Sequence, residues 1–283
     1  MKLRPMLLTA GPLRPDSDRY AFEVKWDGFR ALVDASPKEV TVWSRNGHDM
    51  TSRYPELQGL AGSVTTSVVL DGEIVCLDDK GNPDFAALWL RRRGSSTPAV
   101  CFMAFDVLDV RGRPVIDEPY RERRRILEEL ELDGRHWCTP EIHIGDGAAL
   151  FAATKVMGLE GIVAKRLDSR YYPGSRSRSW TKTKHFQTRT FALLGWLPPQ
   201  EWREDRGCVA VGLRNERGIV LAGFVESGYG RDLIELLPQL TRSDVRCLRQ
   251  EPWQGPDPLL AEVKFLEWSP AGGLRHASIA SIV

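Results

Sequence analysis

Several features that would assign the chain to a special class are missing. The five cysteines are odd in number, scattered, and include no Cys-x-x-Cys pair. This pattern predicts reduced thiols inside a cell and argues against a zinc site. No apolar run is long enough to span a membrane, and the N-terminal apolar stretch is too short for a signal peptide. We therefore expect a cytoplasmic protein without a membrane partner.

A strong net charge is also missing. The formal net charge is +1 over 283 residues, so the total does not indicate a nucleic-acid binder. The segment Lys165–Arg189 is different, because it holds eight basic residues and one acid. We interpret it as a phosphate-contacting segment, against the alternative of a solvated charged face. For the basic run Arg121–Arg125 we favour the alternative, an exposed helix surface.

The segment Phe22–Arg30 organises the remaining chain. Strand alternation places three apolar side chains on one face and the charged Glu23, Lys25 and Asp27 on the other. The Asp27-Gly28 pair predicts a turn, so Lys25 lies where the strand ends. Neighbouring cations or burial favour the neutral amine, which is a nucleophile. The alternative is an edge strand with a solvated lysine.

The sequence Lys25-Trp26-Asp27-Gly28, with Arg30, resembles motif I of the covalent nucleotidyltransferases, Lys-x-Asp-Gly-x-Arg. This family comprises ATP-dependent DNA ligases, RNA ligases and mRNA capping enzymes. Its motif I lysine attacks the nucleotide α-phosphate and carries the nucleoside monophosphate. The resemblance implies that Lys25 is the catalytic nucleophile. It also implies nucleotide contacts for Glu23 and Arg30 and a divalent-metal contact for Asp27.

Three further segments resemble nucleotidyltransferase motifs in the family's order. Arg45, before the Asn46-Gly47 turn, resembles motif Ia, whose arginine meets the sugar and phosphates. The strand-like Val68–Leu77 contains Asp-Gly-Glu-Ile-Val, similar to motif III, and this implies that Glu73 contacts the ribose or a metal. The buried-type strand Val100–Leu108 resembles motif IIIa, which implies that Phe105 stacks on the purine.

The segment Leu159–Lys165 resembles motif IV. The resemblance implies that Glu160 supports a divalent metal and that Lys165 contacts the nucleotide. Strict alternation from residue 160 to residue 165 would place these two side chains on opposite faces of a strand. A bend at Gly161 would reconcile them.

The segment Ser179–Lys184 has an unusual alternation. Period 2 places Trp180, Lys182 and Lys184 on one face, which an ordinary half-buried strand would not do. The segment resembles motif V, and this implies that Lys182 and Lys184 neutralise the triphosphate.

The pattern changes to short strands from Phe191 onward. We predict an α+β protein with two domains: an ATP-grasp-like nucleotidyltransferase (adenylation) domain at 1–187 and an OB-fold β-barrel at 188–283. The end of the chain, Val263–Ser278, resembles that of bacterial C- and D-type ligases, and Arg275 then takes the place of the motif VI arginine that faces pyrophosphate. This segment departs from the family's pattern in two ways. The Arg-x-Asp-Lys form of motif VI is absent, and Ala277-Ser278-Ile279 stands where Pro-Ser-Phe is usual.

The resemblance as a whole implies an ATP-dependent DNA ligase that acts in DNA repair. Such an enzyme uses ATP and Mg²⁺ or Mn²⁺, and seals nicked duplex DNA through a lysyl-AMP intermediate. We expect a monomer in the bacterial cytoplasm, associated with the nucleoid. The alternatives are a capping-type guanylyltransferase, an RNA ligase, and a non-catalytic nucleic-acid binding module.

Overall fold

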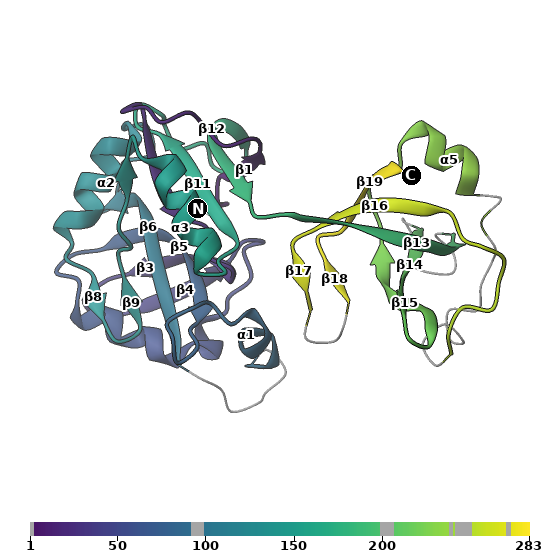
Figure 1. The fold of residues 1–283 in the computed structure, drawn as a ribbon. Coiled ribbons are helices and arrows are strands. Elements are labelled where there is room, and N and C mark those ends of the chain that lie inside the picture. The colour runs from purple at the N-terminus through teal and green to yellow at the C-terminus, as the bar shows by residue number, and fades with distance from the viewer. Residues whose placement is uncertain (1–2, 92–98, 199–206, 238–239, 241–250, 270–272) are drawn as a thin grey trace. The chain divides into compact units, whose positions relative to one another are not determined.

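The computed structural model describes residues 3–91, 99–198, 207–237, 240, 251–269 and 273–283 (Figure 1). The chain divides into two compact units, Met1–Lys184 and His185–Val283. Within the described residues, no helix combines the length and apolar character needed to cross a membrane. The fifth cysteine, Cys247, lies outside the described residues.

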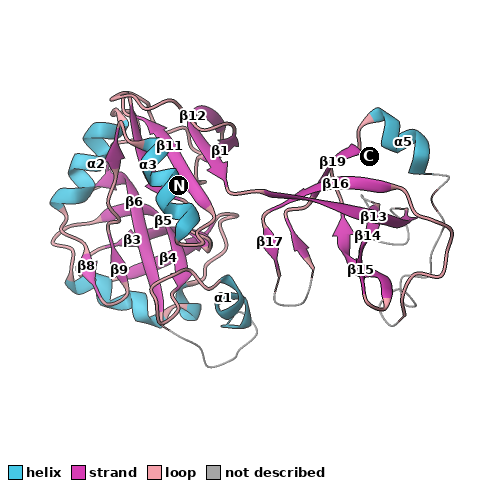
Figure 2. Cartoon of the chain, viewed as in Figure 1, coloured by secondary structure: helices cyan, strands magenta, loops and turns pink. Residues whose placement is uncertain are grey.

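The first unit contains two β-sheets (Figure 2). In spatial order, the five-stranded sheet consists of β1 (Leu7–Ala10), β12 (Arg176–Lys184), β11 (Gly161–Arg166), β2 (Tyr20–Val24) and β10 (His143–Ile144). The seven-stranded sheet consists of β4 (Val40–Ser44), β3 (Phe29–Ala35), β5 (Val68–Cys76), β6 (Val100–Val110), β9 (Trp137–Cys138) and β8 (Asp133–Gly134), with β7 (Arg113–Pro114) paired to β6.

The central strands β5 and β6 are almost wholly buried, because apolar layers cover both of their faces. One layer holds Leu70 and Phe102, which cluster with side chains of neighbouring strands and of the helices on this face of the sheet. The other layer holds Phe105, Leu108 and Trp180, and so includes side chains from both sheets. The space between the two sheets is therefore a packed core, and a pocket there has rigid walls.

Among its described residues, the first unit also contains three α-helices and two short 3₁₀ helices. They are α1 (Phe85–Arg91), α2 (Tyr120–Glu129), α3 (Gly147–Val156), η1 (Thr51–Arg53) and η2 (Pro55–Gly62). Helix α2 packs on β6, and α3 packs on β11 and β2.

The prediction that Arg121–Arg125 forms a plain surface is wrong for two of its residues. Arg123 is fully buried and makes a bidentate ion pair with the equally buried Asp106 of β6, with N–O distances of 2.8 and 2.9 Å. Arg124 is also buried and donates to Pro140 O at 2.6 Å. The reason is that α2 presents this face to the sheet, where long stems pack and paired guanidinium groups are tolerated.

The second unit contains an antiparallel sheet, a hairpin and a short helix. In spatial order, the sheet consists of β15 (Gly218–Val225), β14 (Cys208–Asn215), β13 (Gln187–Leu197), β16 (Leu260–Phe265) and β19 (Ser278–Ile282). The hairpin is β17 (Glu267–Trp268) with β18 (Leu274–Arg275), and the helix is α5 (Arg231–Leu236). Among the described residues, the strand pairings do not close this sheet into the expected barrel.

Candidate active site

A pocket in the first unit lies between the two sheets and is lined from both. Its walls come from β1, β2, β11 and β12 on one side and from β3, β5 and β6 on the other. Six of the predicted site residues line it: Glu23, Lys25, Arg30, Glu73, Phe105 and Lys165. The motifs therefore converge on one cavity although they span more than 140 positions of the chain.

Lys25 lines the pocket and directly follows the last residue of β2. Its backbone N–H donates to Gly161 O at 2.9 Å, which continues the pairing of β2 with β11. Its Nζ donates to Glu160 Oε2 at 2.5 Å. Lys184 forms an ion pair with the other oxygen of the same carboxylate. Glu160 therefore bridges two lysines and fixes where the Lys25 amine lies.

Burial alone would raise the pKa of Glu160, but the charges of Lys25 and Lys184 outweigh it and hold that pKa below its usual range. The carboxylate is therefore ionised at neutral pH, and the two ion pairs weaken only as the pH falls through the lowered pKa. Lys182 lies near the same group: burial, and then Lys184 and Lys25, lower its pKa. Four charged side chains from three motifs therefore interact here, and of these Lys25 lines the pocket.

Gly161 is the bend that the sequence required. Its φ is +145°, and a Cβ there would lie 2.1 Å from Thr183 O of the neighbouring strand. Only glycine fits both the backbone angle and the close approach. The bend allows Glu160 to reach Lys25 while Lys165, further along β11, lines the pocket.

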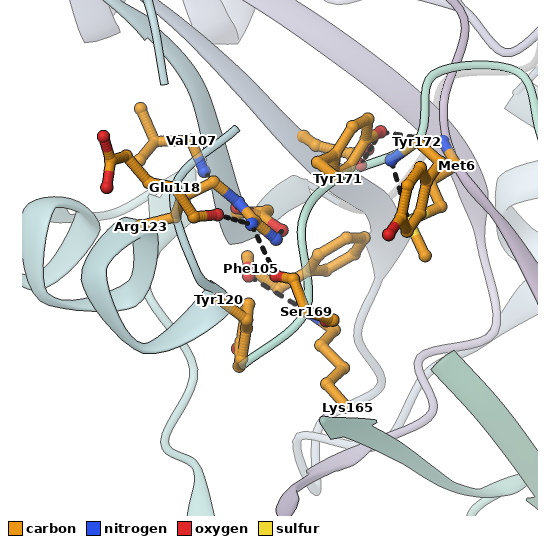
Figure 3. Close-up of polar contacts among 12 residues, drawn as sticks. Met6, Phe105, Val107, Glu118, Tyr120, Arg123, Lys165, Ser169, Tyr171 and Tyr172 are labelled. Carbon is orange, nitrogen blue, oxygen red and sulfur yellow. Dashed lines mark hydrogen bonds and ion pairs between the residues drawn. The ribbon is translucent and has the colours of Figure 1, made fainter. Parts of the chain in front are cut away.

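Arg30 forms the opposite wall, next to Phe105. It makes a bidentate ion pair with the buried Asp71, with N–O distances of 2.6 and 2.7 Å. Asp71 also accepts a 2.5 Å hydrogen bond from the Tyr171 hydroxyl, which in turn accepts one from Met6 N–H at 2.8 Å (Figure 3). The Arg30 guanidinium lies 4.5 Å from the centre of the Phe105 ring. Arg30 and Phe105 are thus held in place before any ligand binds.

Glu73 is aligned with Arg30 across the β3–β5 ladder, where the two residues are directly opposite. Burial raises the pKa of Glu73 to about 7, and nearby Glu160 and Asp71 add to the effect of burial, whereas Arg30 and Lys25 oppose it. A carboxyl with this pKa is divided between its charged and neutral forms near neutral pH. It can therefore accept or donate a hydrogen bond to a ligand hydroxyl.

The raised pKa of Glu73 predicts a pH-dependent effect on stability. The folded state binds this proton more tightly than the unfolded chain, so the Glu73 contribution is present at low pH and is lost as the pH rises toward and through 7. Glu73→Gln cannot ionise. We expect the Tm of this variant to rise relative to that of the wild type as the pH increases from about 5 to 8. A constant difference in Tm across that range would contradict the raised pKa.

Lys165 is enclosed at the inner end of the pocket. Its Nζ pairs with Glu23 Oε2 at 2.8 Å and donates to Phe105 O at 3.1 Å (Figure 3). The ammonium also lies 4.3 to 4.7 Å from the ring centres of Phe105, Tyr120 and Trp180. Burial lowers the pKa of Lys165, and the Glu23 carboxylate acts in the opposite direction.

Six predicted site residues do not line the pocket. Three of them, Glu160, Lys182 and Lys184, interact with Lys25 or with one another beside it. The other three lie elsewhere. Arg45 is exposed in the turn after β4. It directly follows Ser44, the last residue of β4 that pairs with β3. Asp27 lies in the segment between β2 and β3. Arg275 belongs to the second unit, where its guanidinium pairs with Glu267 across the β17–β18 hairpin.

The carboxylates at the site fit a metal that arrives with phosphates. Among the described residues, no three His, Cys, Asp or Glu side chains gather as a preformed metal centre. Mg²⁺ commonly takes one or two protein carboxylates, several waters and the oxygens of its substrate. The predicted ligands Glu160 and Glu73 are near enough for their charges to interact, which suits that mode of binding.

Two aromatic residues that hold the site were not predicted from the sequence. Tyr120 donates to Glu23, and Tyr171 donates to Asp71. Both rings also pack edge-on against Trp180. Neither tyrosine falls in a motif, and a tyrosine at a helix start or in a loop carries no periodic signal, so only the folded chain reveals these contacts.

Comparison with known proteins identifies the fold of the first unit. Residues 13–184 match the family described as ATP dependent DNA ligase domain. The crystal structure of the ligase domain from M. tuberculosis LigD superimposes with a TM-score of 0.64 at 36% identity, covering 99% of this chain and 95% of that chain. The first unit therefore has the fold of a ligase nucleotidyltransferase domain, within a mixed α+β chain.

Curated relatives extend the match over both units. The multifunctional non-homologous end joining DNA repair protein LigD of Mycobacterium tuberculosis is 38% identical over 98% of this chain. The SPbeta prophage-derived DNA ligase-like protein LigB of Bacillus subtilis is 26% identical, with 99% of each chain covered. The chain belongs to the ATP-dependent DNA ligase family, as its motifs predicted. It spans only 38% of the length of that LigD protein.

Proposed function

We propose that this protein seals nicks in duplex DNA in DNA repair, through an AMP group held on Lys25. The observation that carries the proposal is the position of the Lys25 amine. It lies at a pocket lined by both sheets, held by Glu160 and flanked by further lysines. A fixed amine beside cations that can hold phosphates suits phosphoryl transfer, in which catalysis consists mainly of positioning and charge stabilisation.

The reaction begins when the neutral amine of Lys25 attacks the α-phosphorus of ATP. A P–N bond forms, the bond to the β-phosphate oxygen breaks, and pyrophosphate leaves. The proton that the ammonium must lose has an acceptor at hand in Glu160 Oε2. Lys182 and Lys184 offset the charge of the triphosphate. AMP then passes to the 5′-phosphate at the nick, and the 3′-hydroxyl displaces it to close the strand.

The remaining pocket residues would hold the nucleotide. Phe105 and Lys165 face the purine end, and Glu23 lies beside them. Arg30 and Glu73, directly opposite each other on β3 and β5, suit the ribose hydroxyls, and we assign the exposed Arg45 to the sugar and phosphates. A divalent ion, held by Glu160 and Glu73 with a contribution from Asp27, would neutralise phosphate charge when bound.

We assign residues 1–187 to the adenylation domain and 188–283 to an OB-fold domain that grips the duplex. The support for the second assignment is that the described residues of this unit form a five-stranded antiparallel sheet and a short helix, elements that suit that fold. The protein acts as a monomer associated with bacterial DNA. Names of the relatives that include non-homologous end joining support a role in repair.

The family match favours a DNA ligase over a capping guanylyltransferase, an RNA ligase or a non-catalytic binding module. Incubation of the protein with α-labelled ATP, and separately with α-labelled GTP, tests the proposal. We expect label on the protein with ATP, and its release when nicked duplex DNA is added. Label with GTP alone would support capping chemistry, and no label with either would support a binding module.

Arg275 allows the two chemical steps to be separated. If its guanidinium faces the departing pyrophosphate, Arg275→Ala should slow labelling by ATP about a hundredfold, the scale of one lost oxyanion contact. Sealing of a nick that already carries a 5′-adenylate releases no pyrophosphate and should be nearly unchanged. A paired assay of the two activities on the same variant checks this. Equal loss of both, or of neither, would exclude this role.

A further inference from the structure

A buried polar cluster closes the inner end of the pocket. It consists of Glu23 from β2, Tyr120 from α2 and Lys165 from β11, which are 5%, 0% and 2% exposed. The Tyr120 hydroxyl donates to Glu23 Oε1, and Lys165 Nζ lies 2.8 Å from Oε2. Each oxygen of the Glu23 carboxylate therefore has its own fixed donor. Buried polar groups with every partner in place hold a single geometry.

Tyr120 is held by the protein independently of the pocket. Its backbone N–H donates to Ser169 O at 2.8 Å. Three residues further along α2, Arg123 donates to the same Ser169 carbonyl at 3.0 Å and to Glu118 O at 2.6 Å (Figure 3). The ion pair with the buried Asp106 also fixes the Arg123 side chain. The first turn of α2 is thus anchored on two sides, and the phenol is carried with it.

The Tyr120 phenol can only donate to Glu23. Burial, and then the Glu23 charge, raises the pKa of Tyr120 well above its usual value, so the hydroxyl keeps its proton. A carboxylate has about four lone-pair sites, of which two are taken here. Glu23 therefore remains an acceptor toward the pocket, beside the donor Lys165. An acceptor beside a donor matches the amino group and ring nitrogen of adenine, whereas guanine presents a carbonyl oxygen where adenine has the amino group.

We propose that Tyr120 is a positioning residue for base selectivity, which holds Glu23 as an acceptor for the 6-amino group of the purine. The proposal rests on the proposed function, because it concerns the nucleotide that labels Lys25. Without the phenol, one Glu23 oxygen loses its donor, and the carboxylate is free to turn toward Lys165. Base selectivity then falls even though Lys25, Glu160 and the phosphate-binding lysines are untouched.

The test measures labelling rates for Tyr120→Phe with ATP, GTP and the purine ribonucleoside triphosphate that lacks the 6-amino group. Phenylalanine keeps the ring against Trp180 and removes only the hydroxyl. We expect the preference for ATP over the deamino nucleotide to fall about tenfold, the usual consequence of one lost buried hydrogen bond to a charged group. The change should appear mainly in KM for ATP, because the reacting groups are unaffected.

Tyr171→Phe is the matched control. Tyr171 is equally buried, packs edge-on against the same Trp180, and donates to a buried carboxylate, but that carboxylate is Asp71. The Tyr171→Phe variant should therefore lose about as much thermal stability as Tyr120→Phe. It should keep the preference of the wild type for ATP over the deamino nucleotide. Thermal unfolding of both variants reports whether each is folded.

The outcomes separate the two proposals. Selectivity lost in Tyr120→Phe and retained in Tyr171→Phe supports the positioning role. Equal selectivity in both variants, or equal loss of labelling for all three nucleotides in Tyr120→Phe, shows a purely structural role and overturns it. If Tyr120→Phe does not fold, a wild-type protein that labels equally well with ATP and the deamino nucleotide overturns it too. A wild-type protein that no nucleotide labels overturns the proposed function itself.

Discussion

Replacement of Lys25 by alanine is expected to reduce labelling by ATP to background. The alanine has no lone pair to attack phosphorus, and two other lysines of the site are held by carboxylates: Lys184 is paired with Glu160, and Lys165 is buried against Glu23. The fold should survive, because Glu160 keeps Lys184 as its partner. Labelling by α-labelled ATP, read beside a thermal unfolding curve, measures both effects.

Two controls accompany this prediction. Lys25→Arg keeps the positive charge beside Glu160 but removes the nucleophilic amine, so it should also fail to label. Lys155→Ala changes an exposed lysine in the last turn of α3 and should label as the wild type does. A folded Lys25→Ala protein that still took label would assign the nucleophile elsewhere.

Replacement of Glu160 by glutamine is expected to slow labelling about a hundredfold, the cost of a reacting group displaced by about an ångström. Glutamine has nearly the same shape, yet it loses the charge that holds Lys25 and Lys184 together. Lys25, Lys182 and Lys184 then repel one another, so the amine moves and the folded state is weakened. Labelling rate at saturating ATP, with thermal unfolding at neutral pH, checks both parts.

The matched control for this variant is an exposed ion pair. Arg125 is on the solvent side of α2, where it pairs with Glu122 and Glu129. Arg125→Ala also removes a charge with two partners, but exposed pairs contribute little to stability, so labelling should match the wild type. Arg124 is not a suitable control residue, because its side chain is buried. Similar losses in Glu160→Gln and Arg125→Ala would show that general charge, and not this site, governs labelling.

Local patterns in the sequence predicted much of the candidate site. Alternation and the Asp27-Gly28 turn placed Lys25 at the end of a strand, and the structure confirms that β2 ends at Val24. The need for a bend at Gly161 was also visible, because alternation separates Glu160 from Lys165. Such inferences succeed because strand periodicity depends on the backbone geometry of neighbouring residues, which the sequence displays directly.

The sequence by itself determined the family, the order of the motifs and the strand positions of their charged residues. Only the tertiary structure decided the partners: Glu160 with Lys25, Asp71 with Arg30, and Tyr120 with Glu23. It also decided that Arg123 and Arg124 are buried, although their sequence reads as a charged surface. The physical reason is that these contacts join residues far apart in the chain. Which of them meet depends on how sheets and helices pack, and no local period encodes that packing.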